Sequence, residues 1–193
     1  MSNKHEACNT ITQEKPSAWL GHRNFANWLV ETVHPKITVD LGVDWGHSTF
    51  YLAEMEIGDV YGVDSFEGDD HAGIRDTFEY VTSTKEKYKF DNITFIKGYF
   101  DQVASTWDKQ IDILHIDGFH TYDAVRNDYE TWKGFLKEES VIIFHDTEAF
   151  PADVGRFFDE LEMPYKMKFT HSAGLGVATR NLEIMEKIRA KFF

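Results

Sequence analysis

The sequence contains very little cysteine. Among its 193 residues there is one, Cys8. One thiol cannot form a disulfide within the chain, and it cannot build a metal cluster that needs several thiolate ligands. Both kinds of scaffold are therefore excluded. A reducing compartment suits such a chain, so we expect a cytoplasmic location.

Positive charge is also scarce. The sequence has 20 Lys and Arg residues against 33 Asp and Glu residues, which gives a formal net charge of −13. Nucleic acids bind to clustered basic residues, so we expect no nucleic-acid partner. Apolar runs of the length of a signal-peptide core or a membrane span are missing, so we expect no membrane partner. The charge balance suits a small neutral or cationic substrate, and a homo-oligomer stays an open alternative.

Hydrophobic residues are plentiful, at 42% of the chain, and aromatic residues make up 15%. This composition supports a large core, and the length suits one domain. Residues 1–16 are polar and show no periodicity, so we expect a flexible leader there. We expect residues 17–193 to form a single domain.

Short apolar runs alternate with helical patterns along the chain. Five apolar runs predict strands that alternate with helices, at 37–41, 59–63, 93–97, 111–116 and 141–144. Two further strands are predicted near the C-terminus, at 165–169 and 175–179, with only a short loop between them. A parallel crossover needs about a dozen residues, so the last two strands must be antiparallel neighbours. The sequence predicts a Rossmann-like α/β fold with a mostly parallel seven-stranded sheet, a C-terminal antiparallel hairpin, and helices on both faces.

The stretch ITVDLGVDWGHSTFYLAE, residues 37–54, predicts a strand, a turn and the start of a helix. Such units bind nucleotide-like cofactors through helix N–H groups. The turn has two glycines, Gly42 and Gly46, where the dinucleotide fingerprint has three. The acid before them, Asp40, suits a cationic cofactor better than a pyrophosphate. With Ser48, the pattern D-x-G-x-x-x-G-x-S resembles the first motif of class I S-adenosylmethionine-dependent methyltransferases.

Polar residues follow the other predicted strands, at the edge where ligands bind in open α/β sheets. Asp64 ends the second strand, and we expect it to accept hydrogen bonds from ribose hydroxyls. Gly98 and Phe100, after the third strand, are expected to flank an adenine together with Tyr99. His115 lies inside the fourth strand, and we expect it to be a core residue.

Asp117 and Asp146 end the fourth and fifth strands, so we expect their carboxylates to lie close together. Such a pair suits a hard divalent cation, which could bind an acceptor hydroxyl and lower its pKa. His120 follows Asp117 by three residues, and a neutral imidazole there could act as a general base. The alternatives are that the two acids cap the following turns and that His120 has a structural role.

Longer blocks carry a more specific resemblance: VDLGVDWGHS, YGVDSFEGDDHAG, FIKGYFD, ILHIDGFHTYDAV, VIIFHDT and HSAGLGV. They resemble small class I O-methyltransferases related to macrocin-type sugar O-methyltransferases and, more distantly, cephalosporin hydroxylase-like proteins. The resemblance implies a sugar or small-molecule hydroxyl as acceptor and a general base at His120. It also implies roles in binding the cofactor's methionyl part (Asp40, Gly42, Gly46, Ser48), the ribose (Asp64) and a metal (Asp117, Asp146).

The sequence departs from that family at His145, where the sugar methyltransferases have an acidic residue. We count His145 with Asp117 and Asp146 as a metal ligand. The carboxylates favour Mg²⁺ or Mn²⁺, which we expect here. Imidazole suits zinc, iron or manganese better than magnesium, so Fe and Zn stay as alternatives. Two other functions stay open: an iron-dependent hydroxylase-like oxidoreductase that uses His120, His145 and Asp117, and a non-catalytic S-adenosylmethionine-binding protein.

The charged loop from Glu67 to Asp76, which contains His71, is expected to lie over the cofactor and to contribute to substrate choice. The alternative is an ordinary mobile surface loop.

Overall fold

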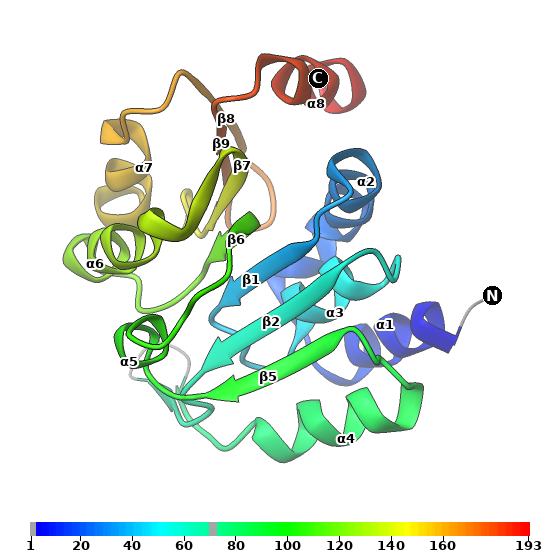
Figure 1. The fold of residues 1–193 in the computed structure, drawn as a ribbon. Coiled ribbons are helices and arrows are strands. Elements are labelled where there is room, and N and C mark those ends of the chain that lie inside the picture. Colours follow the sequence, from blue (N-terminus) through cyan, green and yellow to red (C-terminus); the bar gives the residue numbers. More distant parts are fainter. Residues whose placement is uncertain (1–2, 70–72) are drawn as a thin grey trace.

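The computed structural model of the protein describes residues 3–69 and 73–193. A seven-stranded sheet runs through the molecule in the order β5-β2-β1-β6-β7-β9-β8 (Figure 1). The first five strands in this order are parallel, and β9 pairs antiparallel with both β7 and β8. The predicted fold is confirmed. The strands are β1 Ile37–Leu41, β2 Asp59–Asp64, β5 Ile93–Lys97, β6 Ile111–Ile116, β7 Leu136–His145, β8 Tyr165–Phe169 and β9 Leu175–Thr179.

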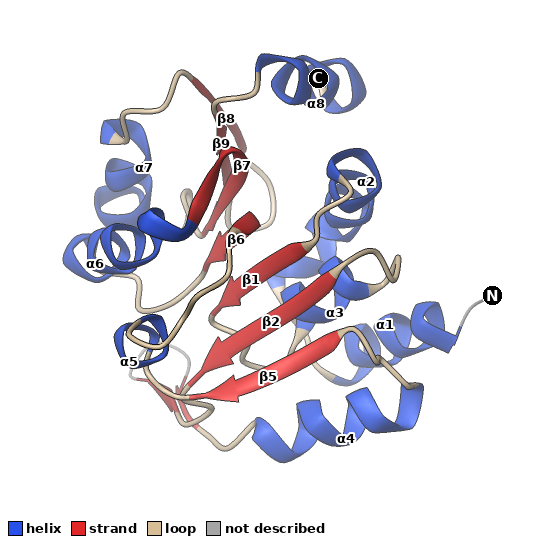
Figure 2. Ribbon diagram, in the orientation of Figure 1, coloured by secondary structure: helices blue, strands red, loops and turns tan. Residues whose placement is uncertain are grey.

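Helices cover both faces of the sheet, and each face has its own apolar cluster (Figure 2). One face carries α1 Asn3–Glu14, α2 Arg23–Val33, α3 His47–Ala53, α4 Phe78–Tyr88 and α8 Leu182–Phe192. The other carries α5 Phe100–Ala104, α6 Tyr122–Trp132 and α7 Arg156–Glu160. Short helical turns are η1 Ala18–His22, η2 Lys133–Phe135 and η3 Pro151–Gly155. Among the described helices, none combines the length and the apolarity needed to cross a membrane.

The loop from Glu67 to Asp76 contains a small antiparallel sheet that the sequence pattern did not reveal. Its strands are β3 Gly68–Asp69 and β4 Gly73–Ile74. Residues 70–72, including His71, lie outside the described residues.

The boundary between α6 and β7 also differs from expectation. The apolar spacing predicted one helix from Tyr122 to Leu136, but α6 ends at Trp132 and one 3₁₀ turn containing Gly134 follows. Leu136 then begins β7 and pairs with Ile111 of β6. Its apolar side chain therefore belongs to a strand, and glycine within the turn favours the end of the helix.

The expectation of a flexible leader over residues 1–16 is wrong for the described part of that segment, because Asn3–Glu14 forms α1. Three small or apolar side chains on one face of this helix, Ala7, Cys8 and Ile11, are fully buried in the core. Their spacing is helical, but three such residues among many polar ones gave too weak a pattern to be recognised.

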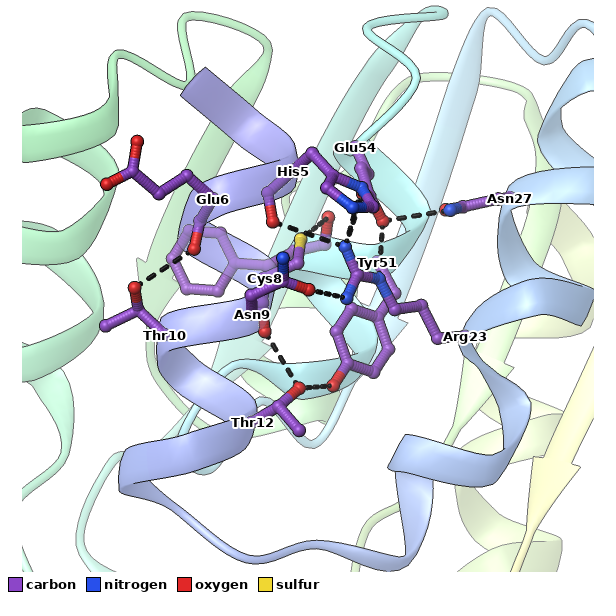
Figure 3. A network of polar contacts seen from close by, with 11 residues as sticks. His5, Glu6, Cys8, Asn9, Thr10, Thr12, Arg23, Asn27, Tyr51 and Glu54 are labelled. Carbon is purple, nitrogen blue, oxygen red and sulfur yellow. Dashed lines mark hydrogen bonds and ion pairs between the residues drawn. The ribbon is translucent and has the colours of Figure 1, made fainter. Parts of the chain in front are cut away.

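A buried ionic cluster joins the first three α-helices (Figure 3). The Glu54 carboxylate follows α3 and accepts hydrogen bonds from Arg23 Nε at 2.9 Å and Nη2 at 2.6 Å, both from α2. Asn27 donates to it at 2.9 Å, and His5 Nδ1 of α1 lies 2.8 Å away. Burial raises the pKa of Glu54, but the hydrogen bonds from Arg23 and Asn27 outweigh it, so this pKa lies below its usual value.

We expect Glu54→Gln to lower the free energy of unfolding at pH 7 by about 2 kcal/mol, because Arg23 loses its buried counter-charge while the His5 end of the cluster stays open to solvent. A carboxylate with a depressed pKa stabilises the fold fully above its unfolded pKa, near 4.5. That stability is lost as the pH falls through the lower folded pKa. The difference between the two proteins should therefore shrink in acid. Urea unfolding at a series of pH values measures it.

The matched control is Glu183→Gln, which removes an exposed pair with Lys187 on α8. We expect no measurable change there, because exposed pairs contribute little. An equal effect of both substitutions at pH 7 would contradict the role of the Glu54 cluster.

Candidate active site

A cavity of about 690 Å³ lies at the carboxyl ends of the parallel strands. Its walls come from the loops after β1, β2, β5, β6 and β7, together with residues of η1. This is the edge of an α/β sheet at which ligands bind, and the volume is in the range of small-molecule sites. Most predicted site residues lie in this wall: Gly42, Ser48, Asp64, Gly98, Phe100, Asp117, His120, His145 and Asp146.

Asp40 and Gly46 are not among the described residues that line the cavity. Asp40 is fully buried behind the wall. One carboxylate oxygen accepts hydrogen bonds from Ser48 Oγ at 2.8 Å and from Thr49 Oγ1, and the other lies 2.5 Å from His115 Nδ1. The structure thus gives Asp40 a supporting position that holds the start of α3. His115 is a fully buried core residue, as expected.

Gly42 is where the loops after β1 and β6 meet. Its φ is +101°, and a Cβ atom there would lie 2.0 Å from the carbonyl oxygen of Asp117. Beside it, the Asp117 N–H donates to the Leu41 carbonyl at 2.8 Å. Only glycine combines this backbone conformation with so close an approach.

Asp64 joins the loops after β1 and β2. One of its oxygens accepts from the backbone N–H groups of Val43 and Asp44, at 2.8 and 2.9 Å. The other accepts from Phe66 N–H at 2.7 Å. Ser65 Oγ lies 3.5 Å from this second oxygen, at the limit of hydrogen bonding. A carboxylate can accept about four hydrogen bonds, so a ligand hydroxyl in the cavity would need to replace only this long contact.

Asp117, His120 and Asp146 form a group of three side chains that could hold a metal ion. One ligand atom from each lies within 4.8 Å of the others. His120 Nε2 is 2.9 Å from Asp146 Oδ2 and 3.5 Å from Asp117 Oδ1. The sequence prediction that the two carboxylates lie close together agrees with this geometry. The sequence analysis predicted that His120 is a general base, whereas in the structure its imidazole belongs to the candidate metal-binding group.

His145 lies beside this group rather than within it. Its Nδ1 is 3.4 Å from Asp117 Oδ2 and 3.2 Å from Asp146 Oδ1. Its Nε2 is buried and has no hydrogen-bond partner among the described residues. Burial lowers the pKa of His120 and His145, but the facing carboxylates outweigh burial and raise these pKa values to about 9 and about 10. In the absence of an ion, two imidazolium groups therefore balance two carboxylates.

Trp19 of η1 contacts this cluster, and it is not among the site residues that the sequence predicted. Its Nε1–H donates to Asp117 Oδ2 at 3.2 Å, and its ring lines the cavity. Phe25 and Trp28, the other aromatics of that segment, pack instead against Phe192 of α8.

Asp128 of α6 is a second cavity residue that sequence reasoning missed. Its side chain is almost fully buried. Burial and the neighbouring Asp101 raise its pKa to about 7. Its position three residues after buried Val125 and four before buried Trp132 places it on the inner face of the helix, which the periodicity could have revealed.

Comparison with known proteins identifies the family. A family model described as "Methyltransferase domain" matches residues 39–147, more than half of the chain. An uncharacterised protein of Sinorhizobium fredii, y4gI, is 32% identical over 180 residues, which cover 88% of this chain. The chain spans only 20% of the length of that relative.

Solved methyltransferases share the fold at low sequence identity. A methyltransferase from Geobacter sulfurreducens has a TM-score of 0.71 at 15% identity, with 93% of this chain and 90% of that chain covered. An O-methyltransferase from Bacillus cereus in complex with SAH has a TM-score of 0.67 at 16% identity, with 92% and 90% covered. The O-methyltransferase TomG from Streptomyces achromogenes, in complex with SAM, has a TM-score of 0.66 at 12% identity, with 90% and 89% covered.

The sheet order of these strands, the cavity at their carboxyl ends and the family match agree: the chain belongs to the methyltransferase domain family.

Proposed function

We propose that the protein is an S-adenosylmethionine-dependent O-methyltransferase that acts on a hydroxyl of a small molecule or sugar with the help of a divalent metal ion. One observation carries the proposal: a single cavity contains both the loop after β1, with Gly42 and Ser48, and the carboxylate pair Asp117 and Asp146. A methyl donor and a bound hydroxyl could therefore meet in it.

The cofactor would lie along the loops after the first three parallel strands. Gly42 and Ser48 would contact its methionyl part, Asp64 the ribose, and Gly98 and Phe100 the adenine. Asp40, and Gly46 before α3, would act indirectly by fixing the start of that helix. The bound SAH and SAM in the Bacillus cereus and Streptomyces achromogenes proteins support this choice of cofactor.

The metal would be held by Asp117, His120 and Asp146. Two carboxylates and one imidazole suit Mn²⁺ and accept Mg²⁺. When bound, the ion would supply positive charge that lowers the pKa of the acceptor hydroxyl. His145 would stay beside the ligands and hold both carboxylates in place. The residues contribute mainly by positioning, since methyl transfer needs the oxygen in line with the methyl group.

His120 has two roles to reconcile. Without an ion the two carboxylates keep it protonated, and a protonated imidazole cannot act as a base. A divalent cation neutralises the same carboxylates and so favours loss of that proton. His120 would then be free to bind the ion or to accept the proton of the hydroxyl.

The hydroxylase-like alternative is not favoured. An iron facial triad uses two histidines and one carboxylate. The candidate group contains one histidine and two carboxylates, and the family match is to methyltransferases. The resemblance to macrocin-type enzymes favours a sugar acceptor, and it stays a prediction.

For the cofactor, we expect one equivalent of S-adenosylmethionine to bind in calorimetry, and Asp64→Ala to weaken binding at least about tenfold through the loss of charge-assisted hydrogen bonds. Asp59→Ala is the matched control, because Asp59 is exposed at the opposite end of β2. Equal affinity of the two variants would contradict the role of Asp64. Absence of binding to the unaltered chain would remove the cofactor proposal.

For the metal, we expect the chain to bind one equivalent of Mn²⁺, measured by the electron paramagnetic resonance signal of the free ion. Asp146→Asn should abolish this binding because it removes a charged ligand. Asp123→Asn, at an exposed position in the first turn of α6, should leave it unchanged. Binding that survives Asp146→Asn would place the ion elsewhere.

A further inference from the structure

The two carboxylate oxygens of Asp117 have different surroundings. Oδ1 lies 3.5 Å from His120 Nε2, on the side of the candidate metal group. Oδ2 accepts a hydrogen bond from Trp19 Nε1 at 3.2 Å and lies 3.4 Å from His145 Nδ1. Side chains outside the group of three therefore engage one oxygen and leave the other on the side of His120.

Trp19 is held firmly enough to impose this difference. Its side chain is 3% exposed. The indole stacks on His145 with ring centroids 5.4 Å apart and meets His115 edge-on at 4.7 Å. Its backbone N–H donates to Ser17 Oγ, which caps η1. The ring cannot turn away from Asp117 without losing both ring contacts.

We infer that Trp19 is a positioning residue for the divalent ion: its N–H fixes Oδ2 of Asp117 and leaves Oδ1 as the ligand atom. The inference rests on the proposed metal site. A carboxylate that binds through one oxygen suits the octahedral geometry of Mg²⁺, which admits few deviations. Groups that hydrogen-bond to metal ligands commonly change metal affinity by 10- to 100-fold.

Trp19 precedes residues 39–147, the segment that the family model matches. The proposed role of Trp19 therefore comes from the segment before residue 39, which the family model does not match.

The experiment compares Mn²⁺ and S-adenosylmethionine affinities in the full chain. Trp19→Phe keeps an aromatic ring but removes the N–H, and we expect Mn²⁺ affinity to fall about tenfold while cofactor affinity changes less than about twofold. Trp28→Phe is the matched control, since Trp28 packs against Phe25 and Phe192 and does not line the cavity. It should change neither affinity. A purely structural role of Trp19 would lower both.

A second variant avoids the loss of ring volume. Replacing the Trp19 indole with benzothiophene keeps the bicyclic shape and puts sulfur in place of the N–H. The same fall in Mn²⁺ affinity is expected, so the test does not depend on whether Trp19→Phe folds.

The outcomes separate the two proposals. If Mn²⁺ binds, Asp146→Asn abolishes binding and the benzothiophene protein binds like the unaltered chain, the inference about Trp19 is overturned and the metal site stands. If the unaltered chain binds no Mn²⁺, the metal proposal fails and the inference fails with it. A selective fall in Mn²⁺ affinity supports both.

Discussion

The site depends on the close approach of two loops at Gly42. The chain leaving β1 touches the backbone of Asp117, at the end of β6, where a Cβ atom could not fit. This contact joins the half of the cavity suited to a cofactor to the half that carries the acids. Behind it, Asp40 ties Ser48 and Thr49 of α3 to His115 of β6, so the same two strands are also connected through a buried carboxylate. A shift of one loop would therefore move both halves of the site.

The balance of charges determines which ligands the acidic half of the cavity can bind. The chain carries a net charge of −13, yet around Asp117 and Asp146 two histidines compensate the carboxylates. A divalent cation in this group would compete with the two imidazolium groups for the same carboxylate oxygens, so binding of the ion would favour release of the histidine protons. The resemblance to macrocin-type enzymes predicts an acidic residue at position 145, and the charge balance gives a physical reason for the histidine found there. An imidazolium beside the carboxylates can lose its positive charge when a cation binds. An acidic residue at the same position would add a third negative charge instead.

The sequence alone was enough to predict the features that local residue patterns determine. Apolar runs gave the strands, and the polar residues that end them, such as Asp64, Asp117 and Asp146, line the cavity because parallel strands end at one edge. Sequence reasoning did not identify contacts that depend on the tertiary structure. Asp40 fits a cofactor motif, but its partners Ser48, Thr49 and His115 engage it within the wall. Trp19 could not be assigned, since its partner lies 98 residues away. The helix at the N-terminus was missed because it is stabilised by packing and by Glu54 rather than by its own composition.

The hydrogen bond from Trp19 to Asp117 also bears on how the site comes together during folding. Linking residues 98 positions apart closes a long loop, and the entropy of that closure must be offset by contacts elsewhere, such as those of α1 and α2 with the core. Residues 39–147 contain both candidate metal-binding acids but lack Trp19, β8 and β9. Within this chain, the segment that the family model matches contains the candidate acids, and the flanking segments contribute Trp19 and two strands of the sheet. This part of the cavity can therefore form only when segments far apart in the sequence have met.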